Sequence, residues 1–318
     1  MVACIAAAFV PVAFGYLHRY EIPYSSAAGI YACFLLLLVY VIAPAMPSGR
    51  AFLSTLIRGR YRALRIGALL TLPYIVYACG TGSFHWLALG RLVGIVAPVL
   101  LIYSVLPVTQ QSKLNWQDIV IAVWLVSVVL FHFFNGIWTV PANLDFISRL
   151  FVVSLGALSW TYLRPIPDLG YELVFRGKTL LAAAKNFAFF AAIAIPLGLL
   201  LGFTSWNPRW HVFIDFLIAY LEILLFIAVL EELFFRGCLQ NLLSKSLNSW
   251  WRAQVIASLA FGLFHILHAP FPNWRYVILA SIAGWFYGSA YRSGGTLFSS
   301  ALLHAMVDTT WRTFLTKK

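Results

Sequence analysis

The chain has 318 residues, of which 62% are hydrophobic and only 10% are charged, and its mean hydropathy is +0.87. A soluble globular domain does not combine so much apolar sequence with so little charge, so the composition predicts a polytopic helical membrane protein. The formal net charge of +12 lies in short loops without any nucleic-acid-binding motif. We therefore exclude nucleic acid as a partner and expect these charges to orient the chain in the lipid bilayer.

Long apolar runs follow one another along the chain. Because one crossing needs about 20 apolar residues, they predict an all-α fold of ten or eleven transmembrane helices. The runs cover residues 2–17, 26–45, 66–80, 88–106, 118–138, 146–163, 180–203, 212–235, 251–268, 274–291 and 296–314.

Basic residues are densest between the second and third apolar runs, in the segment 50–65. Loops rich in Lys and Arg remain in the cytoplasm, so this segment is expected to be cytoplasmic.

The N-terminal residues 1–15 lack a basic region and a small-residue cleavage pattern, so we interpret them as an uncleaved apolar anchor. The four cysteines are isolated in apolar runs and are expected to be buried, without disulfide or metal roles. These cysteines are Cys4, Cys33, Cys79 and Cys238.

A polar stretch punctuated by proline and glycine, residues 164–170, interrupts the apolar pattern. Helices do not cross such a stretch unbroken, so we place a domain boundary there. The prediction is an N-terminal transmembrane extension of unknown role, residues 1–165, followed by a C-terminal domain, residues 166–318. Five of the ten acidic residues lie in or beside apolar runs after residue 210, so chemistry is expected in the C-terminal domain.

Two adjacent carboxylates lie in one of these apolar runs, 212–235, and an arginine directly follows it. An ionised group in hydrocarbon is costly unless it is paired or solvated, so such groups suggest a functional site. Glu232 and Arg236 are four residues apart and meet on one helix face, whereas Glu231 points about 100° away from its neighbour. This spacing predicts a supporting pair, Glu232 with Arg236, and leaves Glu231 free to act as a base.

Histidines on two later helices complete the candidate site. If a turn is centred near Asn248, Glu231 and His265 both lie 17 positions from it and reach the same depth in antiparallel helices. His304 and Asp308 are four residues apart, so the carboxylate can orient the imidazole. Glu231 and His265 are candidates for activating a water molecule, and His304 with Asp308 for stabilising the oxyanion.

The three motifs EExxxR, FxxxH and HxxxD, in this order on successive helices, resemble those of the CPBP family of intramembrane proteases, which includes CAAX proteases and bacteriocin-processing (Abi) enzymes. The resemblance covers about residues 170–314. It implies a glutamate-dependent peptidase without a metal cofactor, in which Glu231 and His265 activate water. Glu232 and Arg236 would hold the site together, and His304 with position 308 would form the oxyanion hole.

The chain departs from this family in two ways. Position 308 is Asp where the well-studied CAAX proteases have Asn, and an ionised Asp308 cannot donate a hydrogen bond to an oxyanion. It is expected instead to orient His304 or to pair with Arg312, or else to be protonated. Residues 1–165 extend beyond the family core, and the resemblance assigns them no role.

The overall prediction is an intramembrane endopeptidase that acts on a membrane-associated polypeptide, in a multi-pass protein expected in a bacterial inner membrane. Its substrate is a secreted or surface protein, a bacteriocin or peptide, or a prenylated protein. One alternative is a zinc protease using Glu231, His265, His268 and His304, which is less favoured because the helical HExxH pairing is absent. The others are a proton-coupled transporter and a non-catalytic scaffold or immunity protein.

Overall fold

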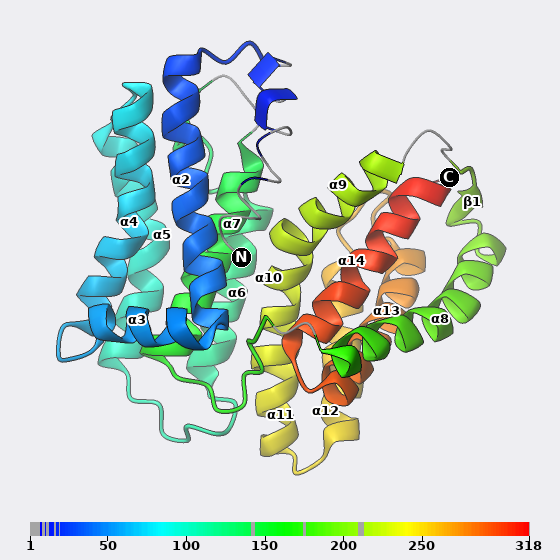
Figure 1. The fold of residues 1–318 in the computed structure, drawn as a ribbon. Helices are drawn as coiled ribbons and strands as arrows, with labels where there is room; N and C mark the ends of the chain where they lie inside the picture. The colour runs from blue at the N-terminus through cyan, green and yellow to red at the C-terminus, as the bar shows by residue number, and fades with distance from the viewer. Residues whose placement is uncertain are drawn as a thin grey trace. The chain divides into compact units, whose positions relative to one another are not determined.

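The computed structural model describes residues 20–140, 144–173, 176–208 and 213–317, together with residues 7, 10, 13–15, 17 and 18 (Figure 1). The chain divides into two compact units. Unit 1 contains residues 1–111 and 115–166, and unit 2 contains residues 112–114 and 167–318. The division between residues 166 and 167 falls in the Pro/Gly-punctuated stretch.

Unit 1 is helical, and its helices follow the predicted apolar runs to within a few residues, with two exceptions. The first run lies largely outside the described residues, and the run 118–138 is helical only as far as residue 130 and continues as turns. An additional short helix, α3, occupies part of the segment expected to be a basic loop. The helices of unit 1 are α2 (Tyr24–Ile42), α3 (Pro47–Ile57), α4 (Arg62–Thr81), α5 (Trp86–Val105), α6 (Trp116–Leu130) and α7 (Asp145–Leu158). Helix α7 continues as a π-helical turn, Ser159–Leu163.

The close packing of α2 against α4 depends on two glycines. A Cβ atom added at Gly29 would lie 2.7 Å from Gly80 Cα, and one added at Gly80 would meet the backbone of Gly29. Small residues of this kind let two helix backbones approach closely within a membrane, where packing rather than hydrophobicity drives association.

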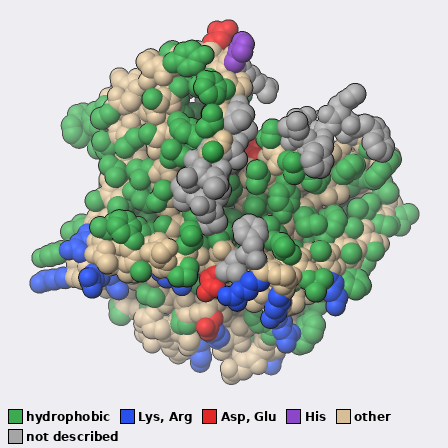
Figure 2. Space-filling view, viewed as in Figure 1, with side chains coloured by type: hydrophobic (Ala, Val, Ile, Leu, Met, Phe, Trp, Pro, Cys, Tyr) green, Lys and Arg blue, Asp and Glu red, His purple; other side chains and the backbone are tan. Residues whose placement is uncertain are grey.

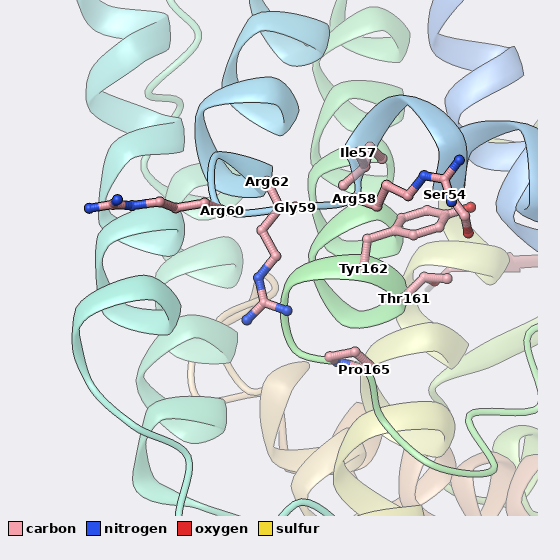
Figure 3. Close-up of a pocket in the computed structure, with 9 residues that line it drawn as sticks. All are labelled: Ser54, Ile57, Arg58, Gly59, Arg60, Arg62, Thr161, Tyr162 and Pro165. Atoms are coloured by element: carbon pink, nitrogen blue, oxygen red, sulfur yellow. The ribbon is translucent and has the colours of Figure 1, made fainter.

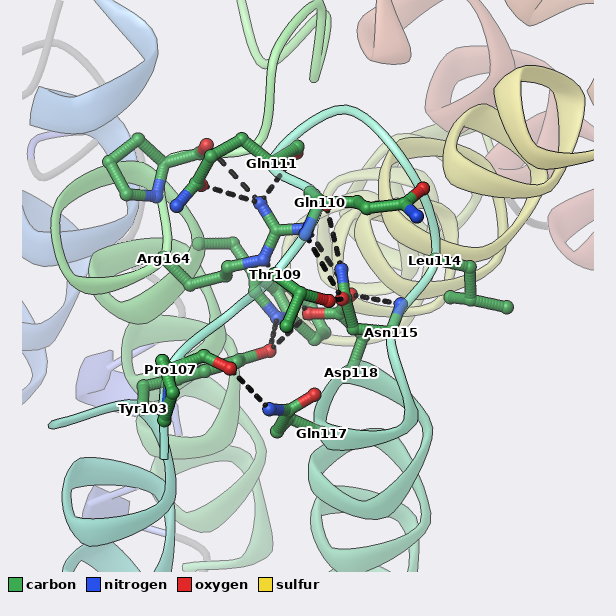
Figure 4. Close-up of polar contacts among 12 residues, drawn as sticks. Tyr103, Pro107, Thr109, Gln110, Gln111, Leu114, Asn115, Gln117, Asp118 and Arg164 are labelled. Carbon is green, nitrogen blue, oxygen red and sulfur yellow. Dashed lines mark hydrogen bonds and ion pairs between the residues drawn. The ribbon is translucent and has the colours of Figure 1, made fainter. Parts of the chain in front are cut away.

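A buried ion pair holds the end of unit 1 together (Figure 4). Arg164 Nε lies 3.2 Å from Asp118 Oδ1, and both side chains are at most 1% exposed. Tyr103 Oη donates to the same oxygen at 2.9 Å, and Trp160 Nε1 donates to Tyr103 Oη at 3.0 Å. Asp118 also closes the capping box of α6 with Asn115. The network satisfies charges that would otherwise be costly at this depth.

Unit 2 also follows the predicted runs. Its elements are α8 (Gly177–Leu200), β1 (Thr204–Trp206), α9 (Phe213–Ile223), α10 (Val229–Glu232), α11 (Asn241–Ser246), α12 (Trp250–Phe264), α13 (Trp274–Gly294), α14 (Leu297–Phe314) and β2 (Leu315–Lys317). Two π-helical stretches, Leu224–Ala228 and Leu233–Gln240, join α9, α10 and α11 into one continuous helical run. This run turns back at Asn248, which has a φ of 46°, and α12 then packs against it.

Strands β1 and β2 form an antiparallel pair in which Ser205 lies opposite Thr316. The last helix is therefore followed by a strand that pairs with another strand of unit 2. Apart from this pair, the described chain is helical, in agreement with the predicted fold class.

Large apolar side chains face outward over much of the described surface, as expected of a chain that contacts lipid (Figure 2). Five described helical segments are long and apolar enough to cross a membrane: Tyr24–Ala45, Arg62–Thr81, Trp86–Val105, Asp145–Leu163 and Gly177–Leu200. The protein is thus an integral membrane protein.

The expectation of buried cysteines is confirmed for Cys33 and Cys238. It is wrong for Cys79, which lies on the exposed side of α4. Cys4 lies outside the described residues.

Candidate active site

The centre of the candidate site is a buried chain of charges formed by Arg236, Glu232 and His304. Arg236 Nε lies 3.1 Å from Glu232 Oε2, and neither side chain is exposed. The other oxygen of that carboxylate, Oε1, lies 3.0 Å from His304 Nδ1. Glu232 thus connects the helical run 213–246 to α14. The predicted pairing of Glu232 with Arg236 is present, and the contact with His304 is an addition that helix spacing could not predict.

Arg236 is also surrounded by aromatic rings. Its guanidinium carbon lies 5.1 Å from the ring centre of Phe261 and 5.5 Å from that of Tyr287. Within the described part of the chain, none of the three guanidinium nitrogens Nε, Nη1 and Nη2 has a hydrogen-bond partner. Ring faces attract a desolvated cation, so they partly replace the water that this guanidinium has lost.

Glu231 has a different environment from its neighbour. Its side chain is 20% exposed, whereas that of Glu232 is completely buried. Glu231 Oε2 has no hydrogen-bond partner among the described residues, and His304 Nε2 lies 3.9 Å away from it, beyond hydrogen-bond distance. Glu232 therefore has the closer contacts of the two carboxylates, and Glu231 has the more exposed side chain.

Both carboxylates lie on α10, a single α-helical turn between two π-helical stretches. Each π-helical stretch replaces the usual backbone hydrogen bonds with longer i→i+5 bonds, and such stretches are frequent at functional sites. The local widening of the helix is a feature that apolar periodicity does not reveal.

Helix α14 contributes His304 and Asp308, which share one face as their spacing predicts. His304 Nε2 lies 3.5 Å from Asp308 Oδ2, and the Asp308 side chain is 38% exposed. Arg312, the other expected partner of Asp308, instead lies 3.1 Å from Glu222 in an exposed pair. Asp308 therefore contacts His304, and Arg312 pairs with Glu222 instead.

His265 follows the last residue of α12 and is nearly buried, with 8% exposure. Its Nδ1 lies 2.8 Å from the carbonyl oxygen of Phe261. Since a carbonyl oxygen only accepts, Nδ1 carries the proton in this contact and Nε2 of the neutral ring retains its lone pair. The Phe261 ring lies 4.9 Å from the His265 ring and 5.7 Å from the His304 ring, which links His265 to the charged cluster.

Two tyrosines of α13 belong to the site although no sequence spacing indicated them. The ring of Tyr287 stacks on His304 at 4.5 Å with an interplanar angle of 17°. The ring of Tyr276 lies 4.6 Å from His265 and 5.1 Å from His268. Both tyrosines restrict the orientation of an imidazole, and only the packing of α13 against α12 and α14 brings them there.

A protein metal site needs several donor side chains that converge on one point. In the described ranges, no group of three His, Cys, Asp or Glu side chains converges in a way that could hold a metal ion. The expectation of a peptidase without a metal cofactor remains a prediction, which cleavage in the presence of a chelator tests.

Comparison with protein families identifies the segment that contains these residues. Residues 213–310 match the family of type II CAAX prenyl endopeptidases described as Rce1-like, and this confirms the family resemblance of the three motifs. The matched segment begins at α9, includes every candidate site residue and ends within α14. Comparisons with curated proteins and with solved structures found no match.

Proposed function

We propose that this membrane protein is an endopeptidase in which Glu231 and His265 activate a water molecule to hydrolyse a peptide bond. The family of residues 213–310 is one of proteases, which supports peptide hydrolysis in general. The catalytic class and the roles of individual residues are proposed from the geometry of the described side chains.

The proposal rests on the different contacts and exposure of the two adjacent glutamate side chains. Glu232 Oε1 is hydrogen-bonded to His304 Nδ1 at 3.0 Å, and Glu232 Oε2 forms an ion pair with Arg236 Nε at 3.1 Å that lacks hydrogen-bond geometry. Glu231 Oε2 is buried and lies 3.9 Å from His304 Nε2 without a hydrogen-bond partner among the described residues, but the Glu231 side chain as a whole is 20% exposed. A general base needs a free carboxylate within hydrogen-bond reach of water, and of these two glutamates Glu231 provides one.

His265 supports the same step. The Phe261 carbonyl holds its Nδ1 proton, so the Nε2 lone pair is available to accept a proton or to position the water. The ring is kept in place by Tyr276 and Phe261, so its orientation does not depend on the substrate.

His304 is proposed to stabilise the negative charge that develops on the substrate carbonyl. Its Nδ1 faces Glu232 and its ring stacks on Tyr287, which fixes its orientation. Its Nε2 faces Asp308 and the free oxygen of Glu231, on the side where the water would react. A donor that is oriented in advance stabilises an oxyanion more than a mobile donor does. Asp308 acts by orienting this imidazole.

The substrate is proposed to be a membrane-associated polypeptide. Its class is open among a secreted or surface protein, a bacteriocin or peptide, and a prenylated protein. A bacterial inner membrane is the proposed location of the protein.

The test compares peptide cleavage by the wild-type chain and the Glu231→Gln and His265→Ala variants in reconstituted membranes, using candidate partner polypeptides. General-base catalysis contributes about 10²–10⁴-fold, so each variant is expected to lose at least about 100-fold in turnover. Glu222→Gln is the matched control, because Glu222 lies on the same helical run in an exposed pair with Arg312. Its turnover is expected to be unchanged.

A strong zinc chelator is added in a second arm. Cleavage that survives chelation and is lost in Glu231→Gln supports the metal-free mechanism. Loss of cleavage on chelation would instead favour the zinc alternative, and full activity in Glu231→Gln would refute the role of Glu231.

A further inference from the structure

A pocket of about 580 Å³ lies in unit 1 beside the turn that joins α3 to α4 (Figure 3). Arg58 and Arg62 of this turn line it, and Thr161 and Tyr162 of the π-helical turn after α7 line its other side. In Figure 3, Arg62 points toward Pro165 and Arg58 lies near Tyr162 and Ser54, whereas Arg60 points away from them. The volume is within the range of about 300–1,000 Å³ that is usual for ligand pockets.

The positive charge at this pocket has no carboxylate to balance it. Arg58, Arg60, Arg62 and Arg65 are all exposed, and none of them forms an ion pair within the described ranges. The sequence has no acidic residue between Glu21 and Asp118. Four cations within eight residues repel one another, so an anion bound among them would relieve an unfavourable arrangement.

The N-terminus of α4 adds to this positive field. The helix begins at Arg62, no side chain caps it, and its first turn contains no acidic residue. A helix N-terminus carries about half a positive charge and free N–H groups, so it favours an anion and disfavours an arginine. The position of Arg62 is unfavourable unless an anion lies nearby.

The surroundings of the pocket favour a lipid phosphate as this anion. Phe52 and Leu56 of α3 are 62% and 43% exposed, and Leu64 of α4 is 70% exposed. Exposed apolar side chains on the helices that flank a cationic turn are typical of a surface at the membrane interface, where acyl chains and headgroups meet.

We propose that the pocket between the α3–α4 turn and the end of α7 binds the anionic headgroup of a phospholipid. Arg58 and Arg62 contact the phosphate, and the apolar side chains of α3 and α4 contact the acyl chains. This gives unit 1 a lipid-recognition role that does not depend on the proposed peptidase mechanism.

The test measures lipid binding to the full-length chain by native mass spectrometry from mixed micelles that contain phosphatidylglycerol or phosphatidylcholine. The wild-type chain is expected to retain phosphatidylglycerol preferentially. A basic residue near an anionic lipid contributes about fivefold in affinity, so Arg58→Gln/Arg62→Gln is expected to weaken phosphatidylglycerol binding by about 30-fold. Arg252→Gln removes an exposed arginine of α12 in unit 2 and is expected to change binding by less than about twofold.

A further measurement tests the identity of the ligand. Inorganic phosphate is added as a competitor, and it should displace the lipid only weakly because it lacks acyl chains. Unchanged affinity in the double arginine variant, or displacement by phosphate at concentrations similar to that of the lipid, would overturn the proposal.

Discussion

Replacing Arg236 by methionine tests whether the buried ion pair holds the candidate site together. The variant keeps an unbranched side chain and leaves the Glu232 carboxylate without its arginine. Removing one partner of a buried pair costs about 3–5 kcal/mol, and the low end applies because His304 still contacts Glu232 at 3.0 Å. The lost contacts with the rings of Phe261 and Tyr287 add about 1 kcal/mol. We expect the free energy of unfolding to fall by about 4 kcal/mol.

Equilibrium unfolding in mixed micelles of dodecyl maltoside and SDS, followed by circular dichroism, measures this loss, and a thermal scan should show a Tm lower by about 8–16 °C. The double variant Glu232→Gln/Arg236→Met should recover at least half of the loss, because it removes both charges and keeps an oxygen for His304. Arg252→Met, an exposed control on α12, should change stability by less than about 0.5 kcal/mol. A loss below about 1 kcal/mol in Arg236→Met would refute the reasoning, since a pair that weak behaves like one in water.

Two other predictions concern the chemistry of α14 and the packing of α12. Asp308→Asn still offers an oxygen to His304, so peptide turnover should stay within about tenfold of wild type, while Asp308→Leu should lose at least about 100-fold; equal turnover in all three chains would show that position 308 does not act. Gly262→Ala places a Cβ atom 2.6 Å from the carbonyl oxygen of Val277, so unfolding should show a loss of about 1–3 kcal/mol. Gly90→Ala, with no atom within 4 Å of the added Cβ, should cause no such loss, and similar stability of the two variants would contradict the close packing.

The sequence alone predicts the helices well for a physical reason. A backbone in hydrocarbon must satisfy its own hydrogen bonds, so each apolar run of sufficient length becomes a helix wherever it packs. Helices α4 and α14 accordingly follow the predicted runs 66–80 and 296–314 closely. Helix α3 was not predicted because it is short and polar at several positions, and such a segment depends on its interfacial surroundings.

The sequence also predicts part of the candidate site, for a similar physical reason. Charged side chains are so rare in the apolar runs that Glu231, Glu232 and Arg236 stand out, and a spacing of four residues predicts which pairs share a helix face. The same rule placed Asp308 beside His304. The roles of these residues in catalysis remain proposals until turnover is measured.

The sequence did not predict the contacts between helices. The bond from Glu232 to His304 joins residues far apart in sequence, and the stacking of Tyr287 on His304 depends on how α13 packs against α14. No fixed spacing relates such residues, because the rotation and depth of each helix are set by side-chain packing. The amino-acid sequence by itself determined a helical membrane protein in which half of the acidic residues lie in or beside apolar runs after residue 210. Only the tertiary structure decided that Glu232 has the closer contact with His304 and that Glu231 has the more exposed side chain, because both depend on how α14 packs against the helical run that carries the glutamates.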